Sequence, residues 1–134
     1  MMNRNLIRVA LSRSMKNSMK KSRTNEQRLS HYDHYSYVIA GNEIVEWGRN
    51  ITKYVPPVHW GYKSFQGLHS ELSAYLKASG KLKEKDFGVI NVRLSRGLNL
   101  LNSAPCQNCR QMLKSLGAKW VIYSTPGGFK KTKL

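Results

Sequence analysis

The chain of 134 residues contains only two cysteines, and both belong to one Cys-x-x-Cys motif, Cys106 to Cys109. Two cysteines cannot form a disulfide framework, so in a reducing compartment the pair indicates a metal site or a redox centre. The sequence also lacks any apolar run that approaches the roughly 20 residues needed to span a bilayer. Its N-terminal apolar patch is short and interrupted, which does not suit a secretory signal. We therefore expect a cytoplasmic protein with no membrane partner.

Acidic residues are scarce as well, since 7 Asp and Glu stand against 23 Lys and Arg and give a net charge of +16. A field of this sign attracts phosphate-bearing molecules, and nucleic acid, free nucleotides and an acidic partner all fit it. Hydrophobic residues make up 40% of the sequence, which excludes wholesale disorder. The length then predicts one globular domain with a single core.

The spacing of apolar residues and turn signals predicts an α/β domain. The expected order is strand, strand, helix, strand, helix, strand over residues 35–40, 43–47, 70–78, 87–94, 106–116 and 120–123. Gly41-Asn42 suits a two-residue hairpin turn between the first strands, and Gly80 and Gly117 are the expected helix stops. The last two strands are joined through a helix and are therefore expected to be parallel.

Two basic segments flank this domain, which we place at residues 31–125. Residues 1–30 form a basic N-terminal helix or arm, with apolar residues at loose helical spacing between residues 6 and 19. Such a helix packs on the sheet with a solvated basic face, or alternatively its cations hold a phosphate backbone. Residues 126–134 contain Gly127-Gly128 and three lysines and are predicted to be a mobile basic tail.

Two short motifs at predicted helix starts carry the chemistry. His69, Cys106 and Cys109 supply three zinc ligands, and Glu71 is a carboxylate that is not needed as a ligand. A structural zinc normally takes four protein ligands, whereas a catalytic zinc keeps one position open for water. A redox Cys-x-x-Cys would not require the upstream His-x-Glu, so the sequence favours a catalytic Zn²⁺ site.

The predicted reaction is the hydrolytic removal of an exocyclic amine from a nucleobase. Zinc lowers the pKa of its bound water toward about 7, so zinc-bound hydroxide is the expected nucleophile. Glu71 is the expected proton shuttle, because one carboxylate can take the proton of the water and deliver it to the ring nitrogen and then to the departing amine.

At these residues the chain resembles the cytidine and deoxycytidylate deaminase superfamily, whose pattern is His-x-Glu followed by Pro-Cys-x-x-Cys. The pattern is met by His69, Glu71, Pro105, Cys106 and Cys109, and the resemblance covers roughly residues 35 to 125. It implies a three-layer α/β/α fold with a mixed central sheet that holds the zinc. Free-nucleotide deaminases of the family are usually oligomers, so the resemblance also implies a homo-oligomer.

The resemblance further implies three substrate-binding residues. Gly48-Arg49-Asn50 resembles the family's Gly-x-Asn, in which the Asn binds the sugar or base, so Asn50 is the first candidate. Ala104 occupies the place where the family uses a backbone carbonyl to receive the exocyclic amine. Ser70 is the third candidate, although relatives more often carry a small apolar residue there.

Three functions remain open at this point. The first is a hydrolase that converts cytosine to uracil in a (deoxy)cytidine nucleotide, with the phosphate held near Arg49 or Lys53. The second is deamination of cytosine or adenine within single-stranded DNA or RNA, which the net charge favours. Aromatic residues of a long loop over 51–68 also favour it, namely Tyr54, Trp60, Tyr62 and Phe65. The third is a non-catalytic zinc module that binds nucleic acid.

Overall fold

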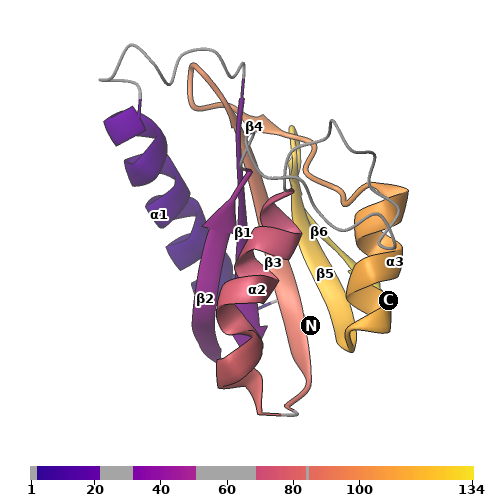
Figure 1. Ribbon diagram of the computed structural model, residues 1–134. Helices are drawn as coiled ribbons and strands as arrows, with labels where there is room; N and C mark the ends of the chain where they lie inside the picture. Colours follow the sequence, from indigo (N-terminus) through magenta and orange to yellow (C-terminus); the bar gives the residue numbers. More distant parts are fainter. Residues whose placement is uncertain (1–2, 22–31, 51–68, 84) are drawn as a thin grey trace.

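The computed structural model describes residues 3–21, 32–50, 69–83 and 85–134. Its centre is a mixed sheet with the strand order β2-β1-β3-β5-β6, in which β4 pairs with β3 (Figure 1). The strands are β1 (Tyr32–Ala40), β2 (Glu43–Arg49), β3 (Phe87–Ser95), β4 (Leu100–Leu101), β5 (Ala118–Thr125) and β6 (Gly128–Lys133). β3 and β5 are parallel, as predicted, and the other paired strands of the described residues are antiparallel.

Helices cover both faces of this sheet (Figure 1). Helix α1 (Arg4–Lys21) contacts β1 and β3 on one face, so the predicted N-terminal helix packs on the sheet. Helices α2 (Ser70–Leu82) and α3 (Gln107–Ser115) lie on the opposite face. The prediction of a three-layer α/β/α architecture is therefore confirmed.

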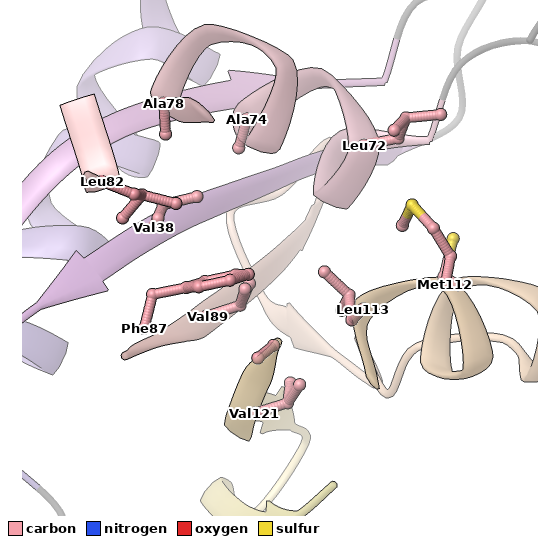
Figure 2. Close-up of a cluster of buried hydrophobic side chains, with 12 residues drawn as sticks. Val38, Leu72, Ala74, Ala78, Leu82, Phe87, Val89, Met112, Leu113 and Val121 are labelled. Carbon is pink, nitrogen blue, oxygen red and sulfur yellow. The ribbon is translucent and has the colours of Figure 1, made fainter. Parts of the chain in front are cut away.

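Strand alternation sends successive side chains into two separate cores. Between the sheet and helices α2 and α3, the buried cluster comprises Val38, Leu72, Ala74, Ala78, Leu82, Phe87, Val89, Cys109, Met112, Leu113, Ala118 and Val121 (Figure 2). On the face of α1 the cluster comprises Ala10, Tyr35, Tyr37, Ile39, Ile90, Val92, Leu94 and Ile122. Burial of apolar surface on both faces fixes the register of β1 and β3, because a slip by one residue would exchange the two sets.

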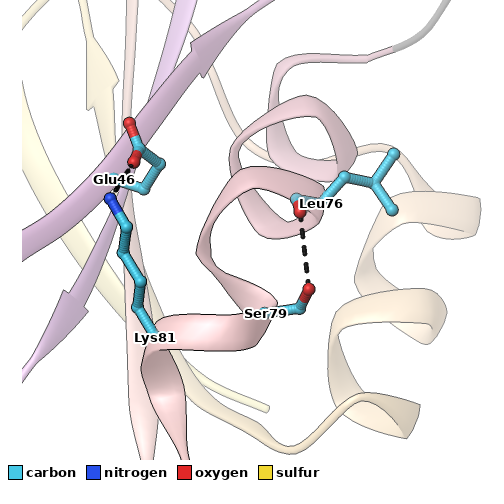
Figure 3. Close-up of polar contacts among 4 residues, drawn as sticks. All are labelled: Glu46, Leu76, Ser79 and Lys81. Carbon is cyan, nitrogen blue, oxygen red and sulfur yellow. Dashed lines mark hydrogen bonds and ion pairs between the residues drawn. The ribbon is translucent and has the colours of Figure 1, made fainter.

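Helix α2 lies unusually close to strand β2. A Cβ atom at Gly48 would lie 2.5 Å from the backbone nitrogen of Ala74, so this approach requires glycine. Farther along the helix, Lys81 Nζ forms an ion pair with Glu46 Oε2 at 2.7 Å, which links the exposed side of α2 to β2 (Figure 3). The close contact at Gly48 fixes the position of the start of α2 over the sheet.

The hairpin prediction is confirmed, whereas one predicted helix stop is wrong. Ala40 pairs with Glu43 across the turn, in which Gly41 has a φ of +62°. Gly80, in contrast, lies inside α2, which continues to Leu82. Glycine costs a helix interior about 1 kcal/mol, and burial of Leu82, which is 5% exposed, offsets that cost.

The predicted mobile C-terminal tail is also corrected. Residues Gly128–Lys133 form strand β6, which pairs antiparallel with β5 from Thr125 back to Trp120. Gly128 has a φ of +130°, so the glycine pair makes the turn that starts the strand. The lysines are typical of a solvated tail, but an edge strand also tolerates charged residues on its exposed side.

Candidate metal and catalytic site

Two helix starts bring the three predicted zinc ligands together. His69 is the N-cap residue of α2, and Cys106 is the N-cap residue of α3, each with an extended backbone. Cys109 follows in the first turn of α3, where its backbone N–H donates to Cys106 Sγ over 3.4 Å. Although 37 positions separate His69 from Cys106, they meet because α2 and α3 contact each other on one face of the sheet.

The three side chains fit a zinc ion. Their ligand atoms all lie within 4.8 Å of one another. His69 Nδ1 is 3.1 Å from Cys109 Sγ and 3.5 Å from Cys106 Sγ. Ligand atoms around a tetrahedral zinc stand about 3.5 to 3.8 Å apart, given bonds of about 2.0 to 2.3 Å. One imidazole and two thiolates form a donor set that suits zinc, and three protein ligands leave a fourth position open.

The environment favours the thiolate form of Cys106. Hydrogen bonding from the Cys109 side chain, followed by that from His69, lowers the pKa of the Cys106 thiol to about 4, although burial opposes the shift. The contact with Cys106 in turn raises the pKa of the His69 imidazole. Metal ligands must be deprotonated, so Cys106 is already in its binding form, whereas a protonated His69 must release its proton to bind.

Glu71 lies in the first turn of α2 and is only 1% exposed. Its Oε1 accepts a hydrogen bond from Ser70 Oγ, and its Oε2 accepts one from Asn91 Nδ2, each over 3.2 Å. The carboxylate is close enough to His69 to raise the pKa of that imidazole, yet it is outside the ligand cluster. A buried carboxylate that is fixed by two donors beside a metal site is suited to acid and base chemistry.

Asn91 is a site residue that the sequence analysis missed. It is fully buried on β3, and its Nδ2 donates both to Glu71 and to the backbone carbonyl of Ser103, the latter over 3.1 Å. Its Oδ1 accepts a hydrogen bond from Ser36 Oγ over 2.6 Å. Asn91 thus connects the carboxylate to the segment that leads into Cys106. A polar amide inside an otherwise apolar strand was the available signal, since buried polar groups require partners.

The three predicted substrate-binding residues occupy different surroundings. Ser70 is fully buried, and its hydroxyl lies 2.7 Å from Ser36 Oγ besides bonding Glu71. Ala104 is exposed two residues before Cys106, and its N–H donates to Asn102 Oδ1 over 2.8 Å. Asn50 follows β2 and is partly buried. Substrate contacts by these residues remain predictions.

A second residue that the sequence analysis missed is His34, on β1. Its backbone N–H donates to Asn50 Oδ1 over 3.4 Å, and its carbonyl accepts from the Asn50 N–H over 3.2 Å. Burial lowers the pKa of its imidazole, and the charge of Glu71 partly opposes this shift. His34 therefore bonds Asn50 through its backbone and lies close enough to Glu71 for that charge to affect its pKa.

Part of the predicted site lies outside the described residues. This applies to the loop aromatics and Lys53, and to the basic residues between positions 22 and 31, whereas Arg49 is described and exposed. Within the described ranges, no helix combines the length and apolar character needed to cross a membrane.

No protein-family model and no curated protein sequence matches the chain. Among solved structures it is similar to the cytidine deaminase from Mycobacterium leprae, with 14% identity and a TM-score of 0.54, over 92% of this chain and 90% of that one. It also matches a cytidine deaminase from Mycobacterium tuberculosis with 17% identity and a TM-score of 0.47, over 77% of this chain and 74% of that one. The first match shows that the chain has the fold of cytidine deaminases, as its zinc motif predicted.

Proposed function

We propose that this protein is a zinc-dependent hydrolase that removes the exocyclic amine of cytosine in a (deoxy)cytidine nucleotide. The observation that carries the proposal is the buried Glu71 carboxylate, which two donors hold beside a three-ligand cluster to which it does not belong. A structural metal site has no use for such a group, whereas deamination requires one. The shared fold supports the same assignment, because the solved neighbour is itself described as a cytidine deaminase.

His69, Cys106 and Cys109 are the residues that would hold Zn²⁺. Zinc bound there would supply Lewis acidity, which makes water a competent nucleophile near neutral pH. The thiols must stay reduced to bind it, so the proposal includes a reducing compartment such as the cytoplasm.

Glu71 performs the proton transfers in this proposal. Water forms a bond to C4 of cytosine, and Glu71 takes the water's proton and delivers it to the ring nitrogen N3. Glu71 then transfers the second proton of the former water to the exocyclic amine, the C4–N bond breaks, and ammonia and uracil result. The hydrogen bonds from Ser70 and Asn91 keep the carboxylate in one position throughout. Such fixed placement lowers the cost of orienting the group in each turnover.

Deamination of a base within single-stranded DNA or RNA is the second candidate. It is favoured by the net charge of +16 and by the exposed cations Arg4, Arg8, Arg13 and Lys16 of α1. Basic surfaces bind the phosphate backbone without regard to sequence. The nucleotide assignment ranks first because it needs only groups at the site itself. A homo-oligomer that completes the pocket is compatible with both candidates.

The test offers dCMP, CMP, single-stranded DNA and single-stranded RNA in parallel to the purified, zinc-loaded protein, and measures ammonia release and base conversion. The Glu71→Ala protein is the blank. Conversion of the monophosphates supports the nucleotide assignment, whereas conversion only within a strand supports the second candidate. Silence of the wild-type protein on all four substrates, at full zinc content, would favour a non-catalytic zinc module.

A further inference from the structure

His34 lies on the face of β1 that is turned toward α2, the helix that contains Glu71. Side chains alternate along a strand, so His34 shares its face with Ser36 and Val38, and Val38 belongs to the core beneath α2 and α3. Ser36 contacts Ser70, which is the neighbour of Glu71. His34 is the next residue on this face, about 7 Å farther along the strand than Ser36.

The ring nitrogen Nε2 of His34 is buried, and none of the described residues offers it a hydrogen-bond partner. The backbone of His34 is held in place, since it pairs with Arg93 of β3 and bonds Asn50 through both its N–H and its carbonyl. The strand therefore cannot shift to bring Nε2 within hydrogen-bond distance of a partner. A buried polar atom without a partner is destabilising, and its presence in a site calls for a ligand that completes it.

These surroundings favour the neutral form of the His34 imidazole. Burial lowers its pKa, as do the charges of Arg93 and His69, whereas Glu71 and Cys106 raise it. A neutral imidazole has one donor and one acceptor nitrogen, so Nε2 can take either role according to the tautomer. Such a group suits a neutral polar atom better than a phosphate, which prefers a cation. His34 is also absent from the cluster of metal-ligating side chains among the described residues.

We infer that His34 Nε2 hydrogen-bonds a neutral polar group of the bound nucleoside moiety, on the side away from the reacting amine. This deepens the proposed deaminase function and rests on it. The group is a sugar hydroxyl or the carbonyl oxygen of the base, since these are the neutral polar atoms that a pyrimidine nucleoside carries away from its exocyclic amine. His34 thereby becomes a specificity-determining residue, with Asn50 fixing its backbone.

Binding, measured apart from turnover, tests this inference. The parent is the zinc-loaded Glu71→Gln protein, and the probes are CMP, dCMP and 2′,3′-dideoxycytidine 5′-monophosphate, each titrated by calorimetry. His34→Leu removes the hydrogen-bonding nitrogen at similar volume, and His34→Gln retains a polar group. We expect His34→Leu to weaken CMP binding by about tenfold, with partial recovery in His34→Gln.

The probes distinguish the two atoms. If His34 binds a sugar hydroxyl, the loss caused by His34→Leu disappears for the analogue that lacks this hydroxyl. If it binds the base carbonyl, the loss is equal for all three probes. Equal affinities of parent and His34→Leu for all three would overturn the inference alone, whereas a parent that binds none would overturn it together with the proposed function.

Three further measurements separate recognition from folding. Zinc content and thermal unfolding of each His34 variant must match those of the parent, and a loss of either would assign His34 a structural role instead. In the parent itself, CMP should shift the ¹⁵N resonance of His34 Nε2, a result that requires no substitution at this position. An unchanged resonance at saturating CMP would contradict the inference.

Discussion

The buried polar groups on the two faces of the sheet have different kinds of hydrogen-bond partners. On the face of α1, Tyr37 and Tyr35 each place a hydroxyl beside a serine of that helix, Ser14 at 2.8 Å and Ser18 at 3.0 Å. These pairs form between adjacent layers and satisfy each hydroxyl. On the face of α2 and α3, hydrogen bonds run from Ser36 through Asn91 to a carboxylate.

We infer from this difference that the polar groups on the α1 face serve stability, whereas those on the face of α2 and α3 serve the proposed function. The pairs on the α1 face stabilise the packing of one helix and leave no group for a ligand. The network on the other face ends at Glu71, beside the cluster of His69, Cys106 and Cys109, and the Nε2 of His34, which has no partner among the described residues, lies on the same face. Strand β1 supplies both faces with alternating residues, so neighbours in the sequence serve opposite purposes. Substitutions on the two faces should therefore affect different measurements.

The largest effect is expected from Cys106→Ala, which removes one of the three proposed zinc ligands. The variant should retain little or no zinc after dialysis and should lose the proposed deaminase activity with the metal, because two ligands hold zinc weakly. Metal content by mass spectrometry checks the prediction. Arg110→Ala, on the exposed side of the same helix, is the control and should keep its zinc. An unchanged zinc content in Cys106→Ala would remove this residue from the ligand set.

Glu71→Gln should lose nearly as much activity while keeping its zinc. The amide has almost the shape of the carboxylate but cannot shuttle a proton, and general acid and base catalysis contributes about 10² to 10⁴-fold. Ammonia release and zinc content, measured on the same sample, check both parts. Retained turnover would contradict the role of Glu71 as the proton shuttle.

The metal-free protein should show an acidic thiol at Cys106. Its pKa of about 4 lies below the ordinary value of 9.0, so the folded state favours the thiolate. The stability from this preference is complete above the ordinary pKa and is lost as the pH falls toward 4. Absorbance of the thiolate at 240 nm, compared with that of Cys106→Ser, should therefore persist at pH 6. A titration near pH 9 would contradict the hydrogen bonding described for this site.

The cluster of His69, Cys106 and Cys109 and the carboxylate beside it could be predicted from the sequence because short motifs at helix starts contain them, whereas their roles as zinc ligands and as acid remain predictions. The partners that support Glu71 could not. Asn91 lies 20 positions from Glu71 and 55 from Ser36, so only the sheet register brings these side chains together. His34 was missed for the same reason, since its significance depends on its Nε2 having no hydrogen-bond partner among the residues that the structure describes.

The strands themselves were predicted with uneven success for a related physical reason. Buried strands such as β3 are mostly apolar, with Asn91 and Arg93 as interruptions, and this composition identifies them directly. β6 is an edge strand in which all six residues are only partly buried or exposed and three of them are lysines, so its sequence resembles a solvated tail. The segment is a strand because it forms hydrogen bonds with β5, and local composition does not reveal these bonds.

A smaller effect, on both activity and stability, is expected from Asn91→Leu. This change leaves Glu71 Oε2, the Ser36 hydroxyl and the Ser103 carbonyl without their shared partner, so the free energy of unfolding should fall by about 1 to 3 kcal/mol. Activity should fall by about tenfold because the carboxylate loses one of its two donors. Ile90→Val, on the α1 face of the same strand, is the control and should cost about 1 kcal/mol with activity unchanged. Denaturant unfolding and kcat/KM are the two measurements.

The smallest effect, confined to stability, is expected from Tyr37→Phe on the α1 face. The substitution removes the hydroxyl that pairs with Ser14 and should lower the free energy of unfolding by about 1 kcal/mol. Ser14 also donates to the carbonyl of Ala10 over 2.8 Å, so it retains a partner and the loss should be modest. Since the Tyr37 ring belongs to the core on the face opposite Glu71, kcat/KM and zinc content should stay at wild-type values. A loss of activity in Tyr37→Phe at full zinc content would show that the two faces are coupled and that the separation argued from strand alternation does not hold.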